Sequence, residues 1–174
     1  MILWFCVPSI LAVFAIFRDA SVDYRLVGLG ALLPDLIDGV IARRMAWAHS
    51  VVVVVGVLFG LMLVTIGRRP LRKKLLAIPI GMFGHLVLDG AWLNTAAFWW
   101  PLTSGVRTPI PMVERGLAKA VAAEVLGAIA LVYFIKRCKL QTPSRRRLFL
   151  RTGTLDPRLI DPASNPLRRR PPGR

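Results

Sequence analysis

Five long apolar runs constrain the fold of this chain more than any other feature. Each has about the 17–25 residues that carry a helix across a hydrocarbon layer about 30 Å thick. Backbone N–H and C=O groups in lipid must pair within the protein, so we expect these runs to be helical. The sequence predicts an all-α, polytopic membrane helix bundle with four or five spans, the second run being the uncertain one. The runs cover residues 1–17, 26–42, 50–66, 75–100 and 117–135.

The first and second runs raise separate questions. Residues 1–17 carry no charge, no basic segment precedes them and no small-residue cleavage site follows, which favours a retained span over a signal peptide. The second run is interrupted by Pro34, Asp35 and Asp38, and Arg43 and Arg44 follow it. Five crossings would put these arginines on the outer side, so 26–48 can instead be a re-entrant hairpin.

The basic residues are unevenly distributed. The net charge is +15, of which residues 1–135 contribute +5 (12 Lys/Arg, 7 Asp/Glu) and the last 39 residues +10 (12 Lys/Arg, 2 Asp/Glu). An apolar body with a basic end excludes an ordinary soluble domain. The turn at 68–74 and the carboxyl-terminal tail should both be cytoplasmic by the positive-inside rule, which predicts a multi-pass protein of the cell (inner) membrane.

We therefore expect two regions, a transmembrane helical domain at 1–138 and a basic tail at 139–174. The tail holds six of the 13 prolines and two triple-arginine blocks, and it lacks the apolar residues needed to fold alone, which predicts disorder. Such a tail would rest against anionic lipid headgroups. A nucleic-acid or protein docking arm is the alternative, but no nucleic-acid-binding motif supports it.

A few polar residues lie within or beside the apolar runs, where each is costly unless it is paired or bound to a cation. Asp35 and Asp38 are three residues apart, and His85 and Asp89 are four apart, so each pair should share a helix face. His49 begins the third run, and it and His85 are the two histidines of the chain. Carboxylates and imidazoles that converge from several helices are typical of zinc, iron or manganese sites.

Each polar residue also has a structural interpretation. Asp35 could cap a helix after Pro34, and His85 could be a hydrogen-bonded interior histidine. Asp89 could pair with Arg43 or Arg44. Glu124, in the fifth run, could pair with a basic side chain such as Lys119 or Arg115, or support a metal ligand.

Two further patterns concern packing and cysteine chemistry. Gly56 and Gly60 form a G-xxx-G pair, which predicts a close helix contact. Gly81 lies one turn before His85 and should leave room beside its ring. Cys6 and Cys138 are too far apart in the expected bundle to form a disulfide or a cysteine zinc site.

The order of these residues resembles the bacterial membrane-bound metal-dependent hydrolases, the inner-membrane YdjM-like group. The likeness covers about residues 28–101 and depends on three motifs. The first is G-x-L-x-P-D-x-x-D from Gly30 to Asp38, the second runs from Arg44 to His49-Ser50, and the third is G-x-x-x-H-x-x-x-D from Gly81 to Asp89. An aromatic segment that ends in a proline, 99–101, adds to it.

The resemblance implies metal ligands at Asp35, Asp38, His49, His85 and Asp89, with Ser50 beside them. This chain has Gly39 where the family commonly has a histidine, and it has no counterpart of another family histidine before His49.

The resulting hypothesis is a membrane-embedded hydrolase with one divalent metal ion, zinc being the expected one. The metal would activate a water that attacks an ester or phosphoester of a lipid-like substrate, with Asp38 as base and Ser50 as a second catalytic candidate. Two alternatives are a non-catalytic membrane scaffold whose polar residues are structural, and an ion or proton transporter.

Overall fold

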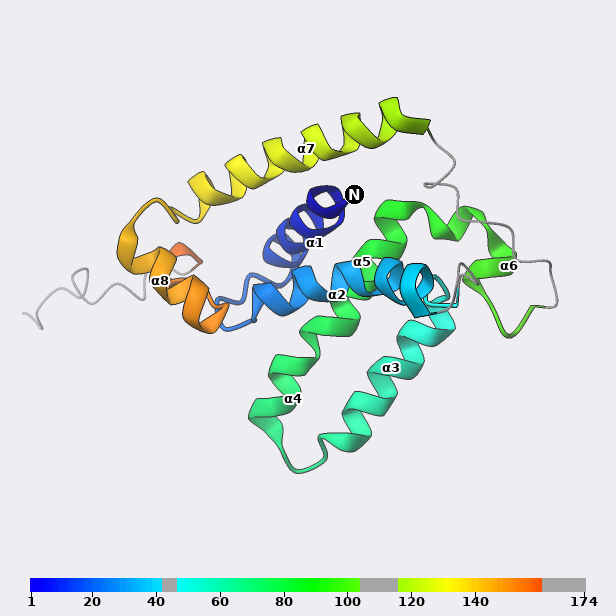
Figure 1. Ribbon diagram of the computed structural model, residues 1–174. Helices are drawn as coiled ribbons and strands as arrows, with labels where there is room; N and C mark the ends of the chain where they lie inside the picture. The colour runs from blue at the N-terminus through cyan, green and yellow to red at the C-terminus, as the bar shows by residue number, and fades with distance from the viewer. Residues whose placement is uncertain (42–46, 104–115, 161–174) are drawn as a thin grey trace, which may run out of the picture.

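A computed structural model describes residues 1–41, 47–103 and 116–160 of the chain (Figure 1). All regular secondary structure in these three ranges is helical, which confirms the predicted all-α class. The helices are α1 (Ile2–Phe17), α2 (Tyr24–Leu36), α3 (Val51–Val64), α4 (Arg69–Leu75), α5 (Ala77–Asp89), α6 (Thr95–Phe98), α7 (Gly116–Arg137) and α8 (Pro143–Thr152). A π-helical turn, η1 (Ile37–Ile41), extends α2, and two 3-10 turns are η2 (Ala91–Leu93) and η3 (Pro157–Leu159).

The helices are shorter than the apolar runs. The fourth run is broken at Gly90, whose left-handed φ of 69° ends α5 and starts η2. By length and composition, one helix in the described residues could cross a membrane, the 22-residue α7. The apolar helices α1 and α3 have 16 and 14 residues. The described structure therefore does not support the expected four or five spans.

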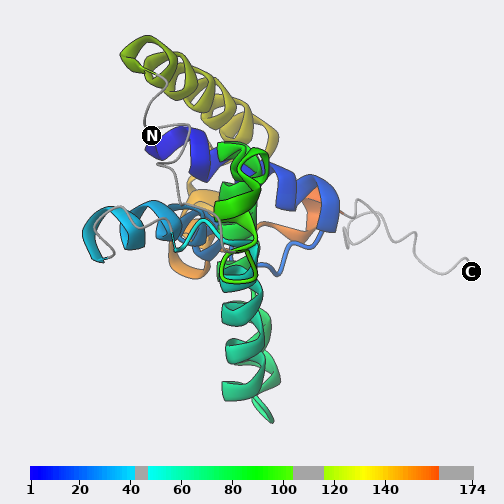
Figure 2. The ribbon, with the colours of Figure 1, turned by 90° about the vertical axis from the view of Figure 1, so that its right-hand side faces the viewer.

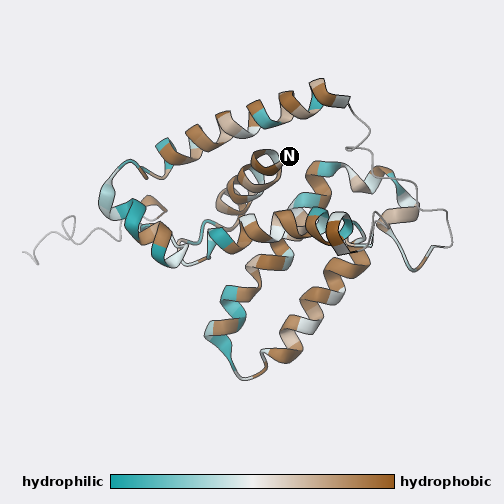
Figure 3. Cartoon of the chain, in the orientation of Figure 1, coloured by the Kyte–Doolittle hydropathy of each residue, from teal (hydrophilic) through white to brown (hydrophobic). Residues whose placement is uncertain are grey.

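The arrangement is a set of crossing helices and not a parallel bundle (Figures 1 and 2). In Figure 1, α7 lies along the top over α1, while α3, α4 and α5 form a hairpin that reaches downward. The apolar residues extend over α1, α3, α5 and α7, and hydrophilic residues gather on α4 and α8 (Figure 3).

Helices α2 and α5 cross with their backbones in close contact because two glycines lie at the crossing. A Cβ on Gly30 would lie 2.2 Å from the carbonyl oxygen of Ile78, and one on Gly81 would lie 2.1 Å from that of Val27. No side chain can occupy either position without moving a helix. The sequence linked Gly81 to the space beside His85, and in the structure it allows the approach of the two helices that carry Asp35 and His85.

Within the described residues, the predicted G-xxx-G contact is absent. A Cβ on Gly56 or Gly60 would meet no described atom within 4 Å, so both glycines face open space on α3. The close contact of this type occurs on α7 instead, where a Cβ on Gly127 would lie 2.6 Å from the backbone of Leu3 and Trp4.

Glu124 has a structural role on α7, as one alternative held, but with a different partner. The backbone N–H of Leu3, in the first turn of α1, donates to Glu124 Oε2 at 3.0 Å. The first N–H groups of a helix have no partner within it, and the helix dipole favours an anion there. Glu124 therefore caps α1 and does not use Lys119; Arg115 lies outside the described residues.

The predicted disorder of residues 139–174 is wrong for their first part. Residues 143–152 form α8, and the following turn docks against residues 20–25, since Tyr24 N donates to Gly153 O (2.9 Å) and Leu155 N donates to Ala20 O (3.0 Å). Arg25 Nη1 also donates to Leu150 O at 2.8 Å. Residues 161–174 lie outside the described residues.

Candidate metal site

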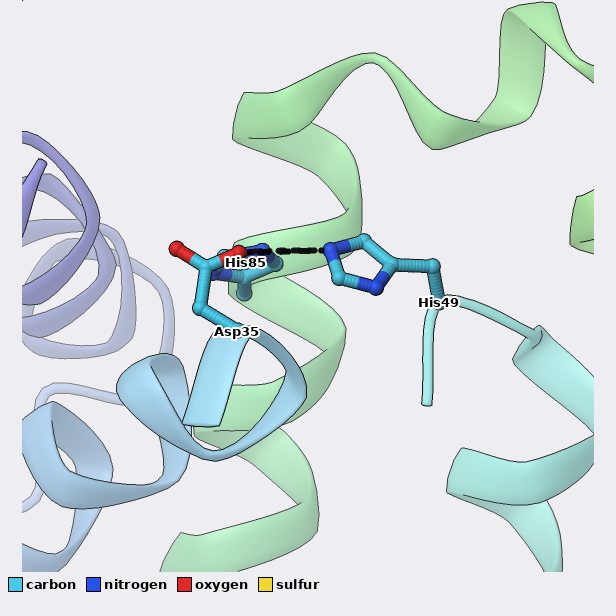
Figure 4. Close-up of side chains that lie close together, drawn as sticks. All are labelled: Asp35, His49 and His85. Carbon is cyan, nitrogen blue, oxygen red and sulfur yellow. Dashed lines mark hydrogen bonds and ion pairs between the residues drawn. The ribbon is translucent and has the colours of Figure 1, made fainter. Parts of the chain in front are cut away.

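Asp35, His49 and His85 converge from three parts of the fold (Figure 4). Asp35 lies in the last turn of α2, His49 lies in the connection just before α3, and His85 lies in α5. One ligand atom from each side chain lies within 4.8 Å of the other two. The prediction that these residues gather in one place is therefore confirmed for three of the five candidate ligands.

Each histidine is held through its Nδ1 atom. His85 Nδ1 lies 2.7 Å from the carbonyl oxygen of Ala31, and His49 Nδ1 lies 2.6 Å from Asp38 Oδ2. A carbonyl oxygen can only accept a hydrogen bond, so His85 must carry its proton on Nδ1. The Asp38 carboxylate favours the same tautomer in His49. Both Nε2 atoms are then left with a lone pair whenever the rings are neutral.

These two Nε2 atoms face each other. They are 3.1 Å apart, and Asp35 Oδ1 lies 3.5 Å from each of them. A tetrahedral zinc ion with Zn–N distances of about 2.0–2.1 Å separates its ligand atoms by about 3.3 Å. The triangle formed by the three atoms therefore has the size of one face of a tetrahedral site.

The environment of His49 shows how strongly this position attracts positive charge. Burial by itself disfavours protonation of the ring, but the carboxylates of Asp35 and Asp38 outweigh that effect and raise the pKa of His49 to about 9. Asp89 acts in the same direction through its charge. A cation between the rings, whether a proton or a metal ion, is therefore stabilised by these carboxylates.

The site is closed on the histidine side and open on the aspartate side. The side chains of His49 and His85 are 1% and 0% exposed, whereas that of Asp35 is 44% exposed. Phe5 of α1 packs against the ring of His85, with centroids 4.0 Å apart. A metal held by the three residues would therefore have a coordination position near Asp35 that external molecules can reach.

Asp38 and Asp89 are not among the three converging ligands. Asp38 lies in η1, and both of its oxygens accept from Ala48 N (3.1 Å) while Oδ2 contacts His49. A carboxylate that orients a ligating histidine is a common element of zinc sites. Asp89 is buried one turn after His85, at the end of α5. Arg43 and Arg44, its proposed partners, lie outside the described residues.

Ser50 is engaged in structure rather than placed among the ligand atoms. Its Oγ accepts from Val52 N (3.1 Å) and so caps α3, and it donates to Trp100 O at 2.5 Å. Trp47 and Trp100 stack with centroids 5.9 Å apart. The hydroxyl therefore ties the start of α3 to the aromatic segment at 99–101.

Two of the alternatives for single residues can be compared with the structure. Asp35 does not cap a helix, because it lies near the end of α2, whose N-cap is Asp23. His85 is a hydrogen-bonded interior histidine, as one alternative held, but its second ring nitrogen still faces the ligand cluster. Sequence reasoning missed Ala31 O and Phe5 as partners of His85, since no local pattern links them to it.

Comparison of the chain with protein-family models, with curated proteins and with solved structures found no match. The function must therefore be argued from the geometry of the site and the surfaces around it.

Proposed function

We propose that this protein is a membrane-bound, metal-dependent hydrolase whose metal ion is held by Asp35, His49 and His85, ligand types that suit zinc. The observation that carries the proposal is the pair of facing Nε2 atoms. Two lone pairs 3.1 Å apart repel unless a cation lies between them, and the hydrogen bonds at both Nδ1 atoms keep the lone pairs there.

The donor set and its surroundings suit catalysis. Two imidazoles and one carboxylate are a ligand set found in catalytic zinc sites, which keep one position open. When bound, zinc supplies a Lewis acid that makes water nucleophilic near neutral pH. The second oxygen of Asp35 points away from both rings (Figure 4) and can accept a proton from an attacking water. Asp38, which the sequence suggested as base, instead holds His49 in position.

The exposed surface supports a membrane location. One face of α7 exposes Val121, Val125, Ile129 and Val132, each more than half exposed, and α3 exposes Phe59 and Leu63 similarly. Apolar surface of this extent is typical of a membrane or protein contact. We propose that α7 spans the cell membrane, that α1 and the α3–α5 hairpin enter it as further spans or re-entrant segments, and that the basic helices α4 and α8 are cytoplasmic.

An apolar groove supports a lipid-like substrate. It has a volume of about 600 Å³ between α1, α3 and α5, and its lining is apolar except for Ser9. On α5 it is lined by Gly84 and Val87, which flank His85 in the sequence, and on α3 by Val54, one turn after Ser50. The acyl chain of an ester or phosphoester could lie in this groove while its head group approaches the metal.

The first test measures metal content. The full chain, purified in detergent, should contain about one zinc ion per chain by element-resolved mass spectrometry, and His49→Ala, His85→Ala and Asp35→Asn should lose it. Asp156→Asn is the control, because that carboxylate pairs with Arg145 in the docked carboxyl-terminal segment. Metal-free wild-type protein would assign the position between the rings to a proton, and metal retained in both histidine variants would show that the metal binds elsewhere.

The second test measures hydrolysis. Wild-type protein should cleave chromogenic carboxylic or phosphate esters with acyl chains, lose this activity on chelation and regain it when zinc is restored. Equal activity of the His85→Ala protein would exclude this site as the source of catalysis, even if the metal assignment were correct.

A further inference from the structure

A second cleft lies at the opposite side of α1 from the apolar groove. It has a volume of about 400 Å³ and lies between α1, α7 and the turn that ends at Ile160. Its lining combines two guanidinium groups and a phenol with apolar side chains. The residues that matter here are Leu11, Phe14 and Arg18 of α1, and Tyr133 and Arg137 of α7.

The apolar and the charged residues of the cleft lie at different levels along α1 and α7. On α1, Leu11 and Phe14 precede Arg18 by seven and four residues, so they lie about 10 Å and about 6 Å further into the helix. On α7, Tyr133 and Arg137 lie in the last two turns. The cleft therefore has an apolar interior, and its charged groups lie where both helices end. Tyr, Lys and Arg are the residues that mark the headgroup level of a membrane.

The two arginines have no carboxylate partner within the described residues. Arg137 lies over the ring of Phe14, 5.8 Å from the centroid, and both arginine side chains are exposed. By contrast Arg25 and Arg145, nearby in the fold, pair with Asp23 and Asp156. The positive charge of the cleft is therefore not neutralised by the part of the chain that the structure describes.

The backbone of Arg18 adds an independent observation. Its φ of 47° and ψ of 35° are left-handed, a conformation that is unfavourable for a non-glycine residue and that glycine adopts freely. An arginine at this helix end is thus unfavourable for the backbone. Its backbone N–H ends α1 by donating to Phe14 O at 3.2 Å, and its side chain makes no ion pair within the described fold, so the guanidinium is available to an external anion.

We propose that this cleft binds an anionic phospholipid, with Arg18 and Arg137 holding the phosphate and the apolar floor holding the start of an acyl chain. Guanidinium groups suit a phosphate because they present several N–H donors in one plane. The apolar interior favours a lipid over free phosphate. The proposal rests on the proposed membrane location, but the cleft shares no residue with the metal cluster, so it does not depend on the metal assignment.

Native mass spectrometry of the detergent-purified full chain tests it, with phosphatidylglycerol and phosphatidylcholine of the same acyl chains as probes. Wild type should retain phosphatidylglycerol in preference to phosphatidylcholine. Arg137→Gln and Arg18→Gly should each weaken this binding about tenfold, the factor expected for loss of a charge-assisted hydrogen bond. Arg18→Gly also relieves the left-handed backbone, so this variant should stay folded, with a thermal unfolding midpoint no lower than that of wild type.

The matched control is the Arg146→Gln/Arg147→Gln double variant, which removes two exposed arginines of α8 that do not line the cleft. Equal loss of lipid in this control would show diffuse attraction and overturn the site, as would equal binding of the two lipids by wild type. Glycerol phosphate should not displace the lipid, and if it does, the apolar part of the assignment is wrong. Zinc content should stay unchanged in all of these variants.

Discussion

His49 and His85 point their Nε2 atoms at each other across 3.1 Å, while each ring is held from behind through Nδ1. The hydrogen-bond partners of the two Nδ1 atoms matter for metal binding as much as the rings do, because they determine which nitrogen of each ring carries the proton. In His85 this partner is the carbonyl of Ala31, and in His49 it is the carboxylate of Asp38. The site is thus arranged for a shared cation before any ligand arrives.

Metal affinity should depend on pH in a defined direction. The pKa of His49 is raised to about 9, so the ring is protonated below that value and a metal ion must displace the proton. Affinity should therefore rise about tenfold per pH unit up to about pH 9 and then level off. Competition with a zinc chelator of known affinity measures this slope. A pH-independent affinity would mean that His49 is not a ligand.

Asp38→Asn tests the orienting contact separately from the ligands. Asparagine can still accept from Ala48 N, but it lacks the charge that favours the Nδ1 proton of His49. Loss of such a partner should weaken zinc binding about 10–100-fold without abolishing it. The same chelator competition gives the value. Complete loss of metal would instead assign Asp38 as a ligand, as the sequence first suggested.

Gly81→Ala should separate α2 from α5. The added Cβ would lie 2.1 Å from the carbonyl oxygen of Val27, a backbone atom that cannot move aside alone. Overpacking of this kind costs about 1–3 kcal/mol, and the thermal unfolding midpoint in detergent should fall, with loss of zinc. Gly56→Ala is the matched control on α3, where the Cβ meets open space.

The control should be neutral or stabilising, since alanine is favoured over glycine within a helix by about 1 kcal/mol. A lower unfolding midpoint in Gly56→Ala would show that α3 does use its glycines for packing, in the full protein or between copies of it.

Gly153→Ala should release α8 from residues 20–25. Gly153 has a φ of +73°, and a Cβ there would overlap the Asp23 carboxylate. Trypsin should then cleave faster at the α8 arginines, which gel electrophoresis can follow over time. Gly67→Ala has a similar φ of +78° with open space around the Cβ, so it controls for backbone strain alone. Equal acceleration in both variants would exclude the contact with Asp23 as the cause.

The sequence predicted those features that depend on local spacing. Helical structure followed from the apolar runs, and the polar residues grouped as one candidate site include Asp35, Asp38 and His49, of which both aspartates contact the His49 ring. The sequence could not show that they contact opposite nitrogens of that ring, because this depends on the π-helical turn and on the connection before α3. The hydrogen bond from His85 to Ala31, 54 residues away, has no sequence signal.

The errors have a common physical origin. A G-xxx-G pattern predicts a packing surface but does not identify which glycines of a chain meet a partner. The pattern predicts a helix contact at Gly56 and Gly60, whereas the close contacts between helices lie at Gly30, Gly81 and Gly127. Composition predicted disorder after residue 138, yet the turn that follows α8 is held by backbone hydrogen bonds to residues 20–24, and composition carries no signal of such distant pairing.

The contact between Glu124 and Leu3 joins positions 121 residues apart, and it has a consequence for biosynthesis. A ribosome completes α1 long before it reaches α7, so in the nascent chain the N–H of Leu3 has no carboxylate partner and must bond to water or to another group. This end of α1 can make its final contact only after Glu124 has been synthesised. The cap at the amino-terminal end of α1 therefore forms only after α7 has been made.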